Sequence, residues 1–326
     1  VSKDYVMHIL RFIKDWTLPV AIATGIIIYL VFALIPVLDG FATAANPVFQ
    51  QLLPVFMFLV LFVTFCKVDF HKLRPVAWHW WIGLFQVLTV GAIMALIICF
   101  NLTGENLILA EAVLTCIICP CASAAAVVTQ KLGGNLEEMT TYTFISNFIT
   151  ALLIPICFPM IDKAADIHFF EAFALILYKV FTVLVAPMIL AYIVKHYAKN
   201  ICQRIISIKD LSYYLWGCSL LIVSGTTMKN ILHADTSITF LLIIAVSSLA
   251  LCLFQFGCGR AIGSQFNQTV NAGQALGQKN TAFAIWIAST YLSPLSSVGP
   301  GCYILWQNII NSWEIWEAQK TAKLGK

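Results

Sequence analysis

The sequence predicts an all-α polytopic membrane protein with ten transmembrane helices arranged as two inverted five-helix repeats. Three observations lead to this prediction. Hydrophobic residues make up 60% of the 326-residue chain and charged residues only 10%, whereas soluble domains carry about 25% charged residues. The apolar residues gather in runs long enough to cross about 30 Å of hydrocarbon. Two runs, the fourth and the ninth, are interrupted near their middle by residues that break helices.

The runs follow one another without a soluble domain or a long linker. We expect spans at residues 17–38, 47–66, 76–100, 107–132, 136–161, 171–194, 210–231, 237–258, 268–292 and 297–316. Residues 1–16 mix apolar and charged positions, which predicts a helix lying in the membrane interface or an extension of the first span. The first repeat then covers residues 17–161, the second covers 162–316, and residues 317–326 form a tail. An odd number of spans in each half places the halves in opposite orientation.

Basic residues predict the orientation in the membrane. Most of the 19 Lys and Arg residues fall in segments that are cytoplasmic if the N-terminus is inside. The positive-inside rule therefore predicts a multi-pass protein of the inner membrane with both termini in the cytoplasm. The net charge of +4 reflects this topology, and we expect no nucleic-acid partner. No phosphate-binding glycine-rich loop is present, so we expect no ATP-driven enzyme and a gradient as the energy source.

The two interrupted runs carry the clearest functional signal. In the fourth, Pro120 cannot donate a backbone hydrogen bond and its ring crowds the preceding turn. In the ninth, Gly277 precedes the polar run Gln278, Lys279, Asn280 and Thr281. Backbone groups freed at this depth are tolerated only where they line a cavity, and such paired breaks are typical of a secondary transporter's binding site. The alternative is a proline kink beside a glycine-rich packing face.

At these residues the sequence resembles the bile acid:sodium symporter family. Residues 119–135 (CPCASAAAVVTQKLGGN) align with a family pattern that begins Cys-Pro and ends Gly-Asn, residues 277–280 (GQKN) match Gly-x-Gln-Asn, and residues 293–312 resemble the Pro-rich start of the last helix. The resemblance implies that helices four and nine are broken and cross. It also implies a core of spans three to five and eight to ten that moves against a panel of spans one, two, six and seven.

The resemblance further implies where substrate binds. Residues that match anion-contacting positions of relatives are Ser123, Asn280, Gln307 and Asn308. Their hydroxyl and amide groups can donate hydrogen bonds to a carboxylate, and helix amino ends favour negative charge. For Gln307 and Asn308, hydrogen bonding between helices is an equal alternative. Coupling at the crossing would involve Pro120, Gln278, Lys279 and Thr281.

The sodium sites of the family look dismantled in this sequence. Gln86 and Thr143 match positions of those sites, but Ala125, Ala126 and Ala275 stand where relatives supply oxygen ligands. Sodium needs several hard oxygen ligands, as other hard cations do, and methyl groups offer none. We therefore expect no cofactor and no firm sodium site.

Lys279 is the residue that most needs an explanation. An ammonium near the bilayer centre costs about 2.5–3.5 kcal/mol on insertion scales. Our hypothesis is that Lys279 takes the space vacated by sodium and is held by the carbonyl ends of the broken helices. Variants are loss of its proton during the cycle, which would give proton coupling, and a direct ion pair with a carboxylate substrate. The alternative is a lysine that reaches a watery cavity without a coupling role.

Together these features predict a secondary active transporter of small organic anions, similar to bile acids, pantoate or keto acids, that works by alternating access and without sodium. Its partners would be the anion and the lipid bilayer. Three alternatives stay open at this point. They are a sodium-coupled symporter that uses the residual ligands, a sensor that binds a solute without moving it, and a metal or metalloid carrier that uses Cys119 and Cys121, since Cys-Pro-Cys can ligate soft metal ions.

Overall fold

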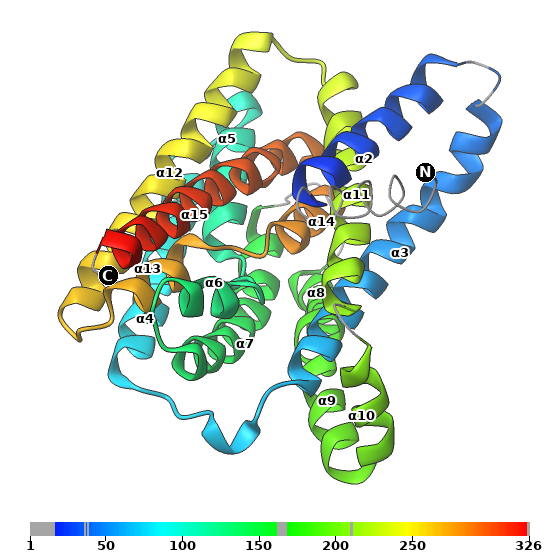
Figure 1. Cartoon of the computed structure of the whole chain (residues 1–326). Coiled ribbons are helices and arrows are strands. Elements are labelled where there is room, and N and C mark those ends of the chain that lie inside the picture. The colour runs from blue at the N-terminus through cyan, green and yellow to red at the C-terminus, as the bar shows by residue number, and fades with distance from the viewer. Residues whose placement is uncertain (1–16, 36, 38, 162–167, 209–210, 325–326) are drawn as a thin grey trace.

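The structure is a computed structural model that describes residues 17–35, 37, 39–161, 168–208 and 211–324. The described residues form helices and no strands (Figure 1). The predicted interfacial helix at residues 1–16 lies outside the described part of the chain. The predicted tail begins inside the last helix, which continues from the last predicted span to Leu324.

The helices of the first half are α2 (Thr17–Leu34), α3 (Asp39–Cys66), the short η2 (Phe70–Lys72), α4 (Ala77–Cys99), α5 (Gly104–Ile118), α6 (Ala125–Lys131) and α7 (Leu136–Ile161). The helices of the second half are α8 (Phe169–Leu184), α9 (Ala186–Tyr197), α10 (Lys199–Ser207), α11 (Leu211–Leu232), α12 (Ile238–Ser264), α13 (Thr269–Gly277), α14 (Thr281–Tyr291), the short η3 (Pro294–Ser297) and α15 (Val298–Leu324). Each predicted span therefore coincides with one helix or with two consecutive helices.

Helix length and composition establish an integral, multi-pass membrane protein. Among the described helices, the segments that are long and apolar enough to cross a membrane alone are Pro47–Cys66, Ala77–Cys99, Leu136–Ile161 and Ile238–Ser264. Counting the bent pairs α8–α9 and α10–α11 as one span each raises the number from 4 to 6. The halves of broken helices are too short to be counted this way. The ten-span inverted repeat stays a prediction.

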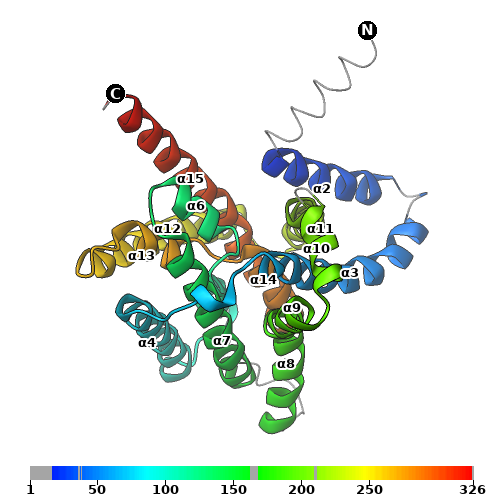
Figure 2. The ribbon, with the colours of Figure 1, turned by 60° about the horizontal axis from the view of Figure 1, so that its bottom comes forward.

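The helices pack into two groups that meet where α7 packs on α8 and where α14 contacts α3 and α11 (Figures 1 and 2). One group holds α2, α3 and α8 to α11, with α11 packed along α2 and α3. The other holds α4 to α7 and α12 to α15, with α12 packed along α13 and α15. We call the first group the panel and the second the core, after the division that the family resemblance implies. Movement of one against the other stays a prediction.

Glycine lets two panel helices approach closely. A Cβ atom on Gly25 of α2 would lie 2.2 Å from the carbonyl oxygen of Leu221 on α11. Small residues are the usual means by which membrane helices bring their backbones together, because lipid gives little hydrophobic drive for association. By contrast, a Cβ on Gly91 of α4 would meet nothing within 4 Å.

We expect Gly25→Ala to lower the apparent melting temperature in detergent, because overpacking costs about 1–3 kcal/mol. The matched control, Gly91→Ala, adds the same methyl group in open space and should leave the melting temperature unchanged or slightly higher, since alanine favours helix. Equal melting temperatures for the two variants would contradict the close approach of α2 and α11.

Candidate functional site

The two broken helices cross in the core. α5 ends at Ile118 and α6 begins at Ala125, while α13 ends at Gly277 and α14 begins at Thr281. Between these ends the two extended stretches pair in antiparallel fashion at Cys121 and Lys279. The Ala122 N–H donates to the Gln278 carbonyl at 2.9 Å, and the Asn280 N–H donates to the Pro120 carbonyl at 2.9 Å. Each break thus supplies hydrogen-bond partners for backbone groups of the other.

Local sequence explains each break. Pro120 has no N–H and ends the helical hydrogen bonding of α5. At the other break, a Cβ on Gly277 would lie 2.4 Å from the Phe256 ring, so a residue without a side chain is required there. The Asn280 side chain then accepts a hydrogen bond from the Phe283 N–H at 3.3 Å and caps the start of α14.

The carbonyls at the end of α5 find side-chain donors, which removes the cost of leaving them bare in a membrane. Gln86 Nε2 on α4 donates to the Ile117 carbonyl at 3.2 Å and the Ile118 carbonyl at 3.1 Å. Thr150 Oγ1 on α7 donates to the same Ile118 carbonyl at 2.8 Å. Three helices of the core therefore meet at the end of α5.

The ammonium of Lys279 joins this group of donors. The residue is 1% exposed, and its Nζ donates to the Ile117 carbonyl at 3.0 Å and the Cys119 carbonyl at 3.3 Å. These carbonyls form the negative end of the α5 dipole, where a cation is stabilised. No carboxylate among the described residues forms an ion pair with it. Its charge is therefore held by backbone dipoles.

The backbone of Lys279 is held as tightly as its side chain. Gln307 Oε1 on α15 accepts from the Lys279 N–H at 2.9 Å, and Gln307 Nε2 donates to the Lys279 carbonyl at 3.2 Å. One turn earlier on α15, the Tyr303 hydroxyl donates to the Gly277 carbonyl at 2.8 Å. Both ends of the Gln307 amide thus make the hydrogen bonds between helices that the alternative describes, while Gln307 also lines the cavity, and its role in substrate binding stays a prediction.

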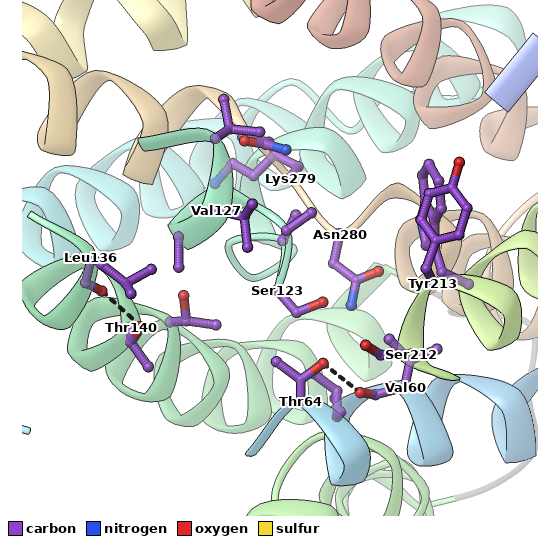
Figure 3. A pocket seen from close by; sticks show the side chains of 18 of the residues that line it. Val60, Thr64, Ser123, Val127, Leu136, Thr140, Ser212, Tyr213, Lys279 and Asn280 are labelled. Atoms are coloured by element: carbon purple, nitrogen blue, oxygen red, sulfur yellow. Dashed lines mark hydrogen bonds between the residues drawn. The ribbon is translucent and has the colours of Figure 1, made fainter. Parts of the chain in front are cut away.

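A cavity of about 790 Å³ lies between the core and the panel. Its polar lining includes Thr64, Ser123, Thr140, Thr143, Ser212, Tyr213, Ser219, Gln278, Asn280, Thr281, Gln307, Asn308, Asn311 and Ser312. Figure 3 shows Ser123 and Asn280 of the core on one side of this space, with Thr64 and Ser212 of the panel opposite them. The exposed Lys67, Lys72 and Lys131 line it as well, so the cavity opens at their end of the molecule.

The structure divides the predicted site residues between the cavity and the crossing. Ser123, Asn280, Gln307 and Asn308 line the cavity. Asn308 also donates to the Ile304 carbonyl of its own helix at 2.6 Å. Of the residues predicted for coupling, Pro120 forms the crossing, whereas Gln278, Lys279 and Thr281 belong to the crossing and also line the cavity. The Lys279 amine itself is bonded on the α5 side.

The residues at the family's sodium positions offer few free oxygen atoms as ligands for a sodium ion. Gln86 donates through its amide nitrogen to the α5 carbonyls, and its Oε1, which is buried without a hydrogen-bond partner among the described residues, is a single free oxygen. Thr143 donates to the Met139 carbonyl at 3.0 Å. Ala125 and Ala275 are 0% and 1% exposed, so buried methyl groups occupy the other positions. The carbonyls that remain nearby accept from Lys279. We therefore derive no step through sodium.

The Cys pair lies inside the crossing. Cys119 and Cys121 are buried, at 0% and 2% exposure. In the part of the chain that the structure describes, no group of three or more His, Cys, Asp or Glu side chains is placed to hold a metal ion.

Sequence reasoning missed the panel side of the cavity and part of the crossing. Thr64 and Ser212 line the cavity, and each is a lone hydroxyl residue near the basic end of a span, which makes no motif. Ser146 accepts from the Cys121 N–H at 2.8 Å. Ser146 and Thr150 are four residues apart and therefore lie on one face of α7. This spacing could have predicted a polar face of α7 toward the crossing.

The described helices and the polar crossing at their centre define an integral membrane protein built around a discontinuous helix pair, a class typical of transporters. Residues 54–234, more than half of the chain, match the Sodium Bile acid symporter family. The chain belongs to this family. No curated protein matches the chain. As a family member it is a membrane transporter of the symporter type, with a small-molecule substrate.

We expect Gln307→Leu to destabilise the protein and to reduce transport, because it leaves the Lys279 N–H and carbonyl without partners. Each buried group left unsatisfied costs about 1–3 kcal/mol. Asn308→Ala is the matched control, since Asn308 bonds only within α15 among the contacts described. Melting temperatures in detergent would contradict the pairing if Asn308→Ala lowered stability as much as Gln307→Leu.

Proposed function

We propose that the protein is a secondary active transporter of small organic anions that works by alternating access and without sodium, and that it is not an enzyme. The observation that carries the proposal is the Lys279 ammonium on the Ile117 and Cys119 carbonyls. The family resemblance implies that in relatives a sodium ion binds beside the crossing, where the Lys279 ammonium lies in this protein. A positive charge fixed in the chain takes the place of that ion.

Electrostatics at the crossing depend on which cation balances the negative end of α5. In a sodium symporter, the carbonyl dipoles at the crossing are balanced only after a sodium ion binds. Binding of the ion therefore favours binding of the substrate, and the two are coupled. Here the Lys279 ammonium lies at the negative end of the α5 dipole, where it is stabilised. Since Ala125, Ala126 and Ala275 offer no oxygen ligands, sodium gains no differential contacts and has no means of driving the cycle.

The substrate side of the proposal rests on the cavity. Its volume of about 790 Å³ is in the range of pockets that enclose small organic ligands. Ser123 and Asn280 offer hydroxyl and amide donors next to the amino end of α14, where negative charge is favoured. Small organic anions such as pantoate, keto acids or bile acids carry oxygen atoms that can accept hydrogen bonds from these groups. The runner-up, a sodium-coupled symporter, would have to use Gln86 and Thr143.

Alternating access is supported by an interaction at the end of the cavity away from the lysines. Asn230 of α11 donates through Nδ2 to Ser297 Oγ at 2.9 Å and the Pro294 carbonyl at 3.0 Å, and Ser289 Oγ lies 3.3 Å from the same nitrogen. These contacts join the panel to α14 and η3 of the core. They must break if the cavity is to open at this end.

The same geometry supports an orientation. The cavity opens at the end that carries Lys67, Lys72 and Lys131, and clustered basic residues favour the cytoplasmic side. We propose that the structure is inward-facing in an inner membrane with both termini cytoplasmic, and that Asn230 closes the outer side.

The first test is counterflow of labelled pantoate, pyruvate and taurocholate in proteoliposomes, with sodium or with choline. We expect at least one anion to exchange at the same rate in both media. Exchange only with sodium would contradict the fixed-cation proposal, and no exchange of any anion would contradict the function.

Lys279→Gln should abolish this exchange in both media, because the α5 carbonyls lose their cation and sodium has no ligand set to replace it. Lys179→Gln is the control, since Lys179 is an exposed lysine within α8 and lies outside the cavity lining. Sodium-stimulated exchange in Lys279→Gln would instead show that sodium can take the lysine's place.

Asn230→Ala should shift the protein toward the outward-open state, because about three polar contacts across the interface are lost. The measure is labelling of a cysteine at Ser293, beside Pro294 but outside the Asn230 contacts, by a membrane-impermeant maleimide from the outside, compared between Ser293→Cys alone and Ser293→Cys with Asn230→Ala. Thr226→Ala, one turn away with a hydroxyl bonded only within α11 among the contacts described, is the control. Unchanged labelling in Asn230→Ala would contradict its gating role.

A further inference from the structure

The cavity's cations are not equally available to a substrate. Among the residues that the structure describes, the lysines that line it are Lys67, Lys72, Lys131 and Lys279, and the carboxylates that line it are Asp69 and Glu137. The Lys279 ammonium is occupied by the α5 carbonyls. Lys72 Nζ lies 2.7 Å from Glu137 Oε1, and this hydrogen-bonded ion pair raises the pKa of Lys72. Lys67 and Lys131 therefore remain as candidates for a substrate's charge.

Position and neighbours distinguish these two lysines. Lys131 ends α6, where the neighbouring lining residues are Val127, Val128 and Leu136. Lys67 directly follows α3 and its Nζ reaches Ser212 Oγ on α11 at 3.5 Å, the outer limit of a hydrogen bond. Lys67 therefore stands beside a hydroxyl that already faces the cavity.

Thr64 extends this group of polar residues into the cavity. It lies about one turn before Lys67, and its Oγ1 donates to the Val60 carbonyl at 2.7 Å. The oxygen keeps lone pairs, and Figure 3 shows it on the same side of the cavity as Ser212. Thr64 and Ser212 face Ser123 and Asn280 across the cavity (Figure 3), and Lys67 lines the same cavity beside Ser212. We call Lys67, Ser212 and Thr64 the panel subsite.

We propose that the panel subsite binds the carboxylate of the substrate, while Ser123 and Asn280 of the core bind a second polar group. The inference rests on the proposed function and names the substrate class: carboxylates that carry a hydroxyl or keto group at a distance from the carboxylate. Lys67 supplies a charge-assisted hydrogen bond, which is stronger than a neutral one. A carboxylate without the second group occupies only half of the site.

The arrangement also makes binding asymmetric across the membrane. The panel subsite and the core residues belong to different helix groups, so they face each other only while the cavity is open at the Lys67 end. When the groups shift, the substrate keeps its core contacts and loses Lys67. The affinity is therefore higher on the Lys67 side than on the opposite side.

The test uses three matched series of probes on purified protein: ω-hydroxycarboxylates of four to eight carbons, the parent carboxylates, and the α,ω-diols of the same lengths. Calorimetry of the wild type should find the tightest binding in the hydroxycarboxylate series. Lys67→Gln should weaken binding of both carboxylate series about tenfold, the loss of one charge-assisted hydrogen bond, and leave the diols unchanged.

Two variants separate this role from a structural one. Lys67→Arg keeps the charge and should restore most of the affinity. Lys131→Gln removes the other available cation of the cavity and should leave binding unchanged. The panel subsite is overturned if Lys131→Gln shows the loss instead, if Lys67→Gln weakens the diols equally, or if the hydroxycarboxylates bind no better than the parent acids.

Failure of the transport function has a different signature. Counterflow of the tightest-binding hydroxycarboxylate, measured in proteoliposomes with the wild type, reports on transport independently of Lys67. Binding without counterflow would contradict the transporter proposal and leave the subsite intact. Counterflow with the same apparent KM in Lys67→Gln and wild type, at the side where Lys67 lies, would overturn the subsite and leave transport intact.

Discussion

The structure depends on how two interrupted helices satisfy their backbone hydrogen bonds inside a membrane. Unpaired N–H and carbonyl groups at this depth cost several kcal/mol each. The breaks pair with each other between Ala122 and Gln278 and between Pro120 and Asn280. Side chains from α4, α7 and α15 supply the remaining partners. This dense pairing makes the crossing one rigid unit against which the cavity is built.

Lys279 links this structural requirement to the proposed mechanism. The carbonyls that α5 leaves free need donors, and an ammonium in hydrocarbon needs acceptors, so each offsets the cost of the other. The lysine amine is therefore turned away from the cavity toward Ile117 and Cys119. The substrate's charge must then be met elsewhere, and the lysines at the cavity mouth become relevant. In the proposed mechanism, this fixed internal cation takes the place of a sodium ion.

Much of this arrangement was predictable from local sequence, and the rest required three dimensions. Pro120 and the run after Gly277 predicted both breaks because their effects act within one turn. The contacts of Gln307 could not be predicted, since they depend on how α15 crosses the second break. Thr64 and Ser212 could not be predicted, because a single hydroxyl residue in an apolar span forms no motif with a recognisable spacing. The span count stays open because half-helices are too short to be recognised by length.

The most direct test is an experimental structure determined in sodium and again in potassium, at a resolution that places the Lys279 side chain and bound ions. The account predicts the Lys279 amine on the Ile117 and Cys119 carbonyls in both, with no sodium ion at the end of α5. A sodium ion coordinated by these carbonyls, with the lysine turned into the cavity, would contradict it.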